Sequence, residues 1–257
     1  MEITKQEKQE IIIIYNLLLN IEQKNQHNKK CLQACQEARN LALDLLKNKS
    51  TKNYLLKITK HTGKMQGINS LSTYKYICDT CMQLKDNKKL ICNKCYADRT
   101  LAQYKQLAPA LIYNTLLLKY TQLSARQLPV INDLYFRFES FADLQNIQHL
   151  RNLYKIARFN PRCHFALWTK NYKLLMQEKA PRNVNIILSS PLLNAVLPAQ
   201  LRDIVKRKTS AKNIKVFSVY DGDNIKAAGQ NCAQKCLTCL KCYKASDKTI
   251  FINEKLK

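Results

Sequence analysis

DLYFRFES at 133–140, DLQNIQHLRNLYKIARFN at 143–160 and CHFALWTK at 163–170 form the stretch that decides the fold. The first and third segments are short and strand-like, and the second places its apolar residues on one helix face. VNIILSS at 184–190, LPAQLRDIVKRKTS at 197–210 and IKVFSVYDGD at 214–223 continue as strand, helix and strand. This alternation predicts βαβ units and an α/β fold, either a partial (β/α) barrel-like domain or an open parallel sheet.

Polar residues follow the predicted strands. Glu139, Lys170, Ser189 and the turn Asp221–Asp223 each stand at a strand end. Because parallel strands end at one edge of the sheet, these residues are the candidates to face a shared site. We expect Glu139, Lys170 and Ser189 to bind a cofactor, with Lys170 contacting a phosphate or carboxylate. The alternatives are a strand-end salt bridge between Glu139 and Arg137, and a plain turn at 221–223.

The first 60 residues predict a helical hairpin. Ile11, Ile14 and Leu18 share one helix face, and CLQACQEARNLALDLLKN at 31–48 repeats apolar residues three and four apart. Cys31 and Cys35 lie on one face as well and are interpreted as core residues rather than as metal ligands. The expected division is therefore a helical hairpin at 1–60 and a metal-binding α/β domain at 61–257.

Two further segments frame the α/β domain. GKMQGINSLS at 63–72 is the first loop-like stretch and holds two of the four glycines. ADRTLAQYKQLAPALIYNTLLLKYTQL at 97–123 has a helical pattern that Pro109 should kink or divide.

The segment ICDTCMQLKDNKKLICNKCYA at 77–97 contains two Cys-x-x-Cys pairs. Such spacing is typical of metal ligands, because the turn after the first cysteine directs the second sulfur toward the same centre. The first cysteine block, which spans 78–95, therefore predicts a metal site with four ligands: Cys78, Cys81, Cys92 and Cys95. A structural zinc held by all four is the simplest interpretation.

A second cysteine block spans 232–242 in NCAQKCLTCLKCYK. Its ligands would be Cys232, Cys236, Cys239 and Cys242. So dense a run favours an iron–sulfur cluster, with [4Fe–4S] as the expected cofactor and Zn²⁺ as the alternative. The first three cysteines have the Cys-x₃-Cys-x₂-Cys spacing of radical S-adenosylmethionine enzymes, although those enzymes carry it after the first strand. The spacing leaves open which cysteines share a centre.

The chain is strongly basic. Its 43 Lys and Arg residues against 18 Asp and Glu give a formal net charge of +25. Self-repulsion of this size predicts a polyanionic partner, DNA or RNA. A base-composition bias toward Lys, Asn and Ile is the alternative, but it does not account for the small number of acids.

Other patterns exclude functions and suggest a compartment. The longest apolar run, IIIIYNLLLNI from Ile11, is too short to span a bilayer, and the charged N-terminus lacks a signal-peptide pattern. We expect a cytoplasmic protein without a membrane partner, in which the 11 cysteines are reduced. No Walker loop, nucleophile elbow or GxGxxG motif is present, which disfavours NTPases, serine hydrolases and Rossmann dehydrogenases.

The motifs resemble those of the phage "gene product 88" family over roughly residues 60–245. GKMQGINSLS, CNKCYA, FNPRCHFALWTK and NCAQKCLTCLKCY carry the resemblance, and CNKCYA is also similar to part of some radical S-adenosylmethionine cluster motifs. The matching positions are Cys92, Cys95, Tyr96, Trp168, Thr169, Lys170, Cys232, Cys236, Cys239 and Cys242. The resemblance implies a phage or mobile-element origin and a metal-bearing α/β fold. Where the family has Gly-Asp after a strand, this chain has Glu139-Ser140.

These observations favour two functional hypotheses. The first is a phage-type iron–sulfur protein in the host cytoplasm that binds nucleic acid or an RNA-containing assembly and modifies it, with S-adenosylmethionine as a cofactor if the chemistry is radical. The second is a non-catalytic, zinc-stabilised regulatory factor that binds nucleic acid or a host protein. The sequence leaves open whether the protein is an enzyme.

Overall fold

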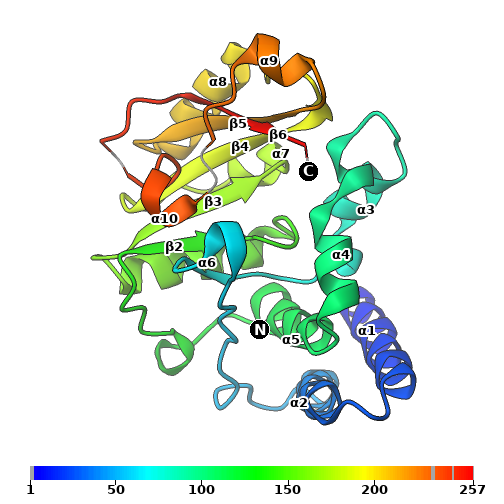
Figure 1. Cartoon of the computed structure of the whole chain (residues 1–257). Coiled ribbons are helices and arrows are strands. Elements are labelled where there is room, and N and C mark those ends of the chain that lie inside the picture. Colours follow the sequence, from blue (N-terminus) through cyan, green and yellow to red (C-terminus); the bar gives the residue numbers. More distant parts are fainter. Residues whose placement is uncertain (1–2, 233–234, 245, 257) are drawn as a thin grey trace.

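The computed structural model describes residues 3–232, 235–244 and 246–256. Within them, a single open sheet of six parallel strands follows the order of the chain, β1 to β6 (Figure 1). The strands are β1 (Asn69–Leu71), β2 (Tyr135–Phe138), β3 (His164–Thr169), β4 (Val184–Leu193), β5 (Ile214–Tyr220) and β6 (Phe251–Lys255). Each strand pairs with the next one in sequence. The expected α/β fold with an open parallel sheet is confirmed.

The helices begin with the hairpin and then alternate with the strands. The α-helices are α1 (Lys5–Lys24), α2 (Lys29–Leu46), α3 (Asp79–Lys85), α4 (Tyr96–Gln103), α5 (Leu107–Tyr120), α6 (Ile147–Phe159), α7 (Tyr172–Leu175), α8 (Ala199–Thr209), α9 (Asn224–Ala228) and α10 (Cys236–Cys239). Short 3₁₀ turns are η1 (Gly63–Met65), η2 (Lys75–Ile77), η3 (Ile91–Lys94) and η4 (Ala125–Gln127). In Figure 1, α1, α2 and α5 lie at one end of the molecule, and α8 and α9 lie at the other.

Strand alternation gives the sheet two different faces. Phe136, Phe165 and Ile186 point to the helix-covered face and join a large core with residues of α5 and α6. Ala166 and Ile187 point the other way, where they pack with Leu240 and Tyr243 from the C-terminal cysteine block. We call this second side the open face. It carries the short helix α10 rather than long crossover helices, and it is therefore the side on which a site can form.

The expected N-terminal helical hairpin is confirmed. Thr4 and Glu7 form a capping box at the start of α1, and Asn28 caps α2. Both helices pack against α5, where the half-buried carboxylate of Glu10 accepts hydrogen bonds from Lys119 Nζ at 2.8 Å and Tyr120 Oη at 2.7 Å. The hairpin contributes to the same continuous core as the sheet. A domain boundary at residue 60 stays a prediction.

The helical pattern at 97–123 is divided, as Pro109 suggested. The break falls at residues 104–106, however, and Pro109 lies in the first turn of α5. Proline is tolerated there because the first backbone N–H groups of a helix have no partner within the helix. The stretch 63–72, expected to be a loop, instead contains η1 and the edge strand β1. Within the described ranges, no helix is long and apolar enough to cross a membrane.

Candidate functional site

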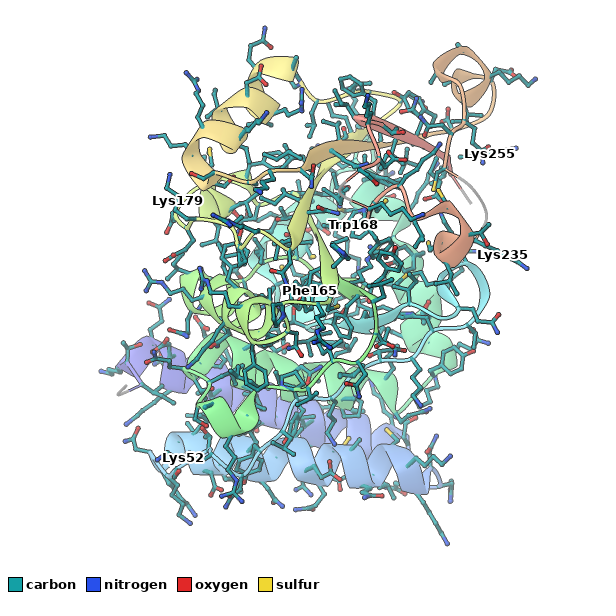
Figure 2. The ribbon with its side chains drawn as sticks, turned by 90° about the vertical axis from the view of Figure 1, so that its left-hand side faces the viewer. Lys52, Phe165, Trp168, Lys179, Lys235 and Lys255 are labelled. Atoms are coloured by element: carbon teal, nitrogen blue, oxygen red, sulfur yellow. The ribbon has the colours of Figure 1, made fainter. Side chains whose placement is uncertain are left out.

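The centre of the open face holds a buried cation. The guanidinium carbon of Arg137 lies 3.9 Å from the ring centroid of the half-buried Trp168, which is labelled in Figure 2. Arg137 Nε is buried and has no hydrogen-bond partner among the described residues. Burial lowers the pKa of Arg137, but nearby Tyr96 and other acidic groups raise it overall, so the side chain stays charged. Since an unpaired buried charge is costly, the position favours an anionic neighbour.

The C-terminal cysteine block lies on this face. Asn185 at the start of β4 donates hydrogen bonds from Nδ2 to the carbonyl oxygens of Cys242 at 3.2 Å and Tyr243 at 2.5 Å. Cys236 and Cys242 pack against the apolar residues of the open face. Gly67, between η1 and β1, approaches α10 closely. It has a φ of +81°, and a Cβ at this position would lie 2.8 Å from Leu237 Cδ2. Glycine at 67 therefore provides both the left-handed turn and the close approach of α10.

A lysine contacts the first thiol of this block. Lys64 Nζ lies 3.1 Å from Cys232 Sγ and forms an ion pair with Glu254 of β6. Burial lowers the pKa of Lys64, but Glu254 and Cys232 raise it overall. Burial raises the pKa of Cys236 and Cys242, and the positive charge of Arg137 opposes this increase. Lys64 and Arg137 would thus stabilise thiolates, the form of cysteine that binds metal.

The first cysteine block follows β1 and lies beside the carboxyl end of β4. An isolated bridge between Leu90 and Leu192 joins the two segments. The thiols of this block, Cys78, Cys81, Cys92 and Cys95, are free. A hydrogen bond with Cys78, together with burial, raises the pKa of Cys81.

Lys170 is one of the cations that affect this first block. Burial lowers its pKa, but Cys92, Asp143 and Cys81 raise it overall. The charge of Lys170 in turn opposes the effect of burial on the pKa of Cys92. The predicted candidate Lys170 is therefore close enough to the first block for its charge to affect the thiols of Cys81 and Cys92.

Asp143 is the residue that organises this end of the sheet, and the sequence analysis did not single it out. Its buried carboxylate accepts hydrogen bonds from Thr169 Oγ1 at 2.5 Å and from the backbone N–H of Lys170 at 2.7 Å. Its own carbonyl oxygen lies 3.7 Å from Cys78 Sγ. Asp143 thus connects β3, the loop after β2 and the first cysteine block. The sequence gives little indication of this role, because a single aspartate before a helix is usually interpreted as a helix N-cap.

Ser189 lies next to the predicted candidate Lys170 at the end of the sheet. The register pairs Thr169 of β3 with Leu188 of β4, so the next residues of the two segments, Lys170 and Ser189, stand side by side. Ser189 lies on the open face, where its carbonyl oxygen accepts a hydrogen bond from Tyr172 Oη at 2.5 Å.

Glu139 instead turns toward α6. Its Oε1 lies 3.2 Å from His149 Nε2, outside hydrogen-bond alignment, and its Oε2 accepts from Thr73 Oγ1 at 3.1 Å. A φ of 54° takes Glu139 out of the strand alternation, a conformation that glycine adopts more readily. The alternative interpretation of Glu139, a strand-end salt bridge with Arg137, is wrong, because no ion pair joins these two described residues. Asp221 accepts a hydrogen bond from Asn224 in an exposed turn, as the alternative interpretation predicted.

No preformed metal site of three or more His, Cys, Asp or Glu side chains occurs in residues 3–232, 235–244 and 246–256. Metal binding by either block is therefore a proposal. The donor chemistry of both blocks fits a thiophilic metal, since each block supplies four thiols and a neighbouring lysine or arginine. Cys31, Cys35 and Cys163, outside the blocks, are buried in the core.

His61 should make the folded chain less stable at acidic pH, because its pKa is lowered by folding. It stacks on Phe141 with ring centroids 5.7 Å apart, and its Nε2 lies 2.7 Å from Ser70 Oγ. Burial and the charge of Arg137 lower the pKa of His61 to about 4. The unfolded chain takes up this proton near pH 6.5, so the stability from His61 is present above that pH and is lost as the pH falls toward 4.

Acidification from pH 7 to pH 5 is expected to lower the free energy of unfolding by at most about 2 kcal/mol through His61. This is an upper bound because His61 is partly exposed. Urea unfolding of the native chain and of His61→Gln at both pH values measures the effect. The variant should lose less stability on acidification. An equal loss in the two proteins would show that His61 protonates normally in the folded state.

Comparison with models of known protein families, with curated proteins and with solved structures found no match. The fold and the cysteine geometry are thus the basis for a functional proposal.

Proposed function

We propose that this chain is a phage-type metal protein that binds nucleic acid or an RNA-containing assembly. The proposed ligands are Cys78, Cys81, Cys92 and Cys95 in the first block and Cys232, Cys236, Cys239 and Cys242 in the second. The basic composition supports the nucleic-acid partner, and the host-cell cytoplasm is the proposed location. The resemblance to the phage "gene product 88" family remains part of this proposal.

One observation carries the metal assignment: each cysteine block has a cation that contacts or electrostatically affects at least one of its thiols. Lys64 contacts Cys232, the charge of Arg137 opposes the pKa increase of Cys236, and the charge of Lys170 opposes that of Cys92. Four thiolates around zinc or an oxidised [4Fe–4S] core leave a net charge near −2, by formal counting. The cations would offset this charge, and so they support a metal without distinguishing iron from zinc.

The density of the C-terminal block favours [4Fe–4S] there, with Zn²⁺ as the alternative. Bound iron–sulfur would supply one-electron chemistry. Lys170 and Ser189 would bind a second cofactor at the carboxyl end of the sheet, S-adenosylmethionine if the reaction is radical. Arg137 would hold an anionic group against Trp168. Glu139 would contribute through His149 and Thr73 rather than through direct contact across the open face.

A second function is favoured by the local packing of the first block. Helix α3 and turn η3 have no buried residues of their own, so they contribute little hydrophobic stabilisation. A zinc ion would supply the missing folding energy, as in small metal-stabilised domains. The protein would then be a regulatory factor that binds nucleic acid or a host protein without catalysis.

Metal analysis of protein purified without oxygen tests both proposals. An iron–sulfur protein would be brown and would contain about four irons and four acid-labile sulfides per [4Fe–4S] cluster. A colourless protein with one zinc per block would establish the structural alternative and exclude radical chemistry. Protein that lacks iron and zinc, though folded and reduced, would contradict the metal proposal entirely.

A further inference from the structure

A basic depression lies at the amino ends of β5 and β6, where α8 approaches the sheet. It encloses about 200 Å³. Five cationic side chains line it together with one carboxylate: Arg202, Lys206, Lys212, Lys215 and Lys248 against Asp247. They come from α8, from the segment leading into β5 and from the segment before β6. Residues from three parts of the chain thus form one strongly positive surface.

The single carboxylate is already paired within the protein. Asp247 Oδ1 accepts hydrogen bonds from Lys215 Nζ at 2.9 Å and from the backbone N–H of Thr249 at 2.8 Å. Lys215 also donates to the carbonyl oxygen of Asp247 at 3.0 Å and is buried. The Lys215–Asp247 pair is therefore a structural part of the floor. The other four cations have no carboxylate partner within the lining of the depression.

Those four cations have weak partners or none. Arg202 Nη1 lies 3.9 Å from Asp203 Oδ1, at the limit for an ion pair, and Asp203 keeps 66% of its side chain exposed. Arg202 Nε is buried and makes no hydrogen bond to the described residues. Lys206, Lys212 and Lys248 are exposed, and no described carboxylate pairs with them. Like charges held this close repel one another unless an anion lies between them.

The lining also indicates which anion fits. The depression has no aromatic side chain on which a base could stack, and its other polar residues are Asn213 and Thr249. Long flexible cations around an open hollow match the spaced phosphates of a nucleic-acid backbone. Figure 2 shows that other lysines, Lys52, Lys179, Lys235 and Lys255, project from different sides of the molecule, so the total charge alone does not locate this contact.

We propose that this depression binds the phosphate backbone of nucleic acid without reading its bases. The inference rests on the proposed nucleic-acid binding and assigns it to one surface. The depression adjoins the amino ends of the strands, whereas Lys170 and the first cysteine block lie at the carboxyl ends. One strand of seven residues, β5, spans about 20 Å between the two ends. The depression is therefore an anchoring surface and is separate from the thiol clusters.

The test compares two triple variants of equal charge, each made in the 257-residue chain and purified in the same way as the unmodified protein. One neutralises the depression, Lys206→Gln, Lys212→Gln and Lys248→Gln. The control neutralises three exposed lysines of the helical hairpin, Lys24→Gln, Lys29→Gln and Lys30→Gln. Binding is measured by fluorescence anisotropy with labelled single-stranded RNA and duplex DNA of two unrelated sequences, over a series of salt concentrations.

We expect the depression variant to bind at least about tenfold more weakly and its log–log salt slope to fall by about two to three, whereas the control changes little. The loss should be equal for both sequences. Equal losses in the two triple variants, or unchanged binding by the depression variant, would overturn the assignment while leaving nucleic-acid binding intact. Absence of binding by the unmodified protein would contradict the proposed function itself. Binding to anionic lipid vesicles but not to oligonucleotides would replace the nucleic acid with a membrane surface.

Discussion

Cys242→Ala is expected to remove the metal proposed for the C-terminal block while leaving the metal proposed for the first block in place. Cys242 lies on the open face near Arg137, and Asn185 Nδ2 fixes the local backbone by donating hydrogen bonds to the carbonyl oxygens of Cys242 and Tyr243. Loss of an outer-shell partner alone lowers metal affinity about 10–100-fold, so loss of a direct thiolate should lower it further. Metal content and visible absorption of the anaerobically purified variant measure the effect.

Two matched substitutions make this result decisive. Cys163→Ala removes the same thiol from the hydrophobic core, where burial raises the pKa of Cys163 to about 12 and keeps it neutral. It should retain full metal content. Cys81→Ala should empty the first block alone. If Cys242→Ala also emptied the first block, the two blocks would share a centre. If the Cys242→Ala protein had the same metal content as the Cys163→Ala protein, Cys242 would not be a metal ligand.

Asp143→Ala is expected to cost about 3–5 kcal/mol of unfolding free energy, a size typical of breaking a buried charged network. The change leaves Thr169 Oγ1 and the backbone N–H of Lys170 without their acceptor. It also removes the carboxylate whose negative charge raises the pKa of Lys170. Urea denaturation at neutral pH, with the metal content of each sample matched, measures the loss.

The control is Asp203→Ala on the exposed surface of α8, where the nearest cation lies 3.9 Å away. Its effect should stay within about 0.5 kcal/mol. Asp143→Asn, which keeps one carbonyl acceptor, should fall between the two. Equal stability of Asp143→Ala and Asp203→Ala would mean that the hydrogen bonds of Asp143 do not stabilise the folded chain.

The sequence predicted the repeating units of the fold because they depend on local periodicity. Strands expected at 133–140, 163–170, 184–190 and 214–223 correspond to β2, β3, β4 and β5. The two edge strands were missed. β1 has three residues, Asn69–Leu71, and β6 is polar at Asn253 and Glu254, so neither shows a clear alternation. Both owe their conformation to pairing with a neighbour already in the sheet.

The candidate site was predicted less completely, because its contacts join distant residues. Position after a strand was enough to place Lys170 and Ser189 on one side of the sheet. It failed for Glu139, since a positive φ turns this residue toward His149. No local pattern indicates that Asp143 contacts Lys170, or that Arg137 stacks on Trp168. Such pairs follow only from the register of the assembled strands.

The contact of Lys64 with Cys232 and Glu254 has a consequence for how the chain is made. Lys64 precedes the first strand and Glu254 belongs to the last, 190 residues later. During synthesis from the N-terminus, the helical hairpin and the early βαβ units can form before this clasp exists, because domains fold as their residues emerge. Contacts of such long sequence separation are among the slowest to form. The C-terminal thiols therefore stay accessible to solvent on the nascent chain until its last segment docks.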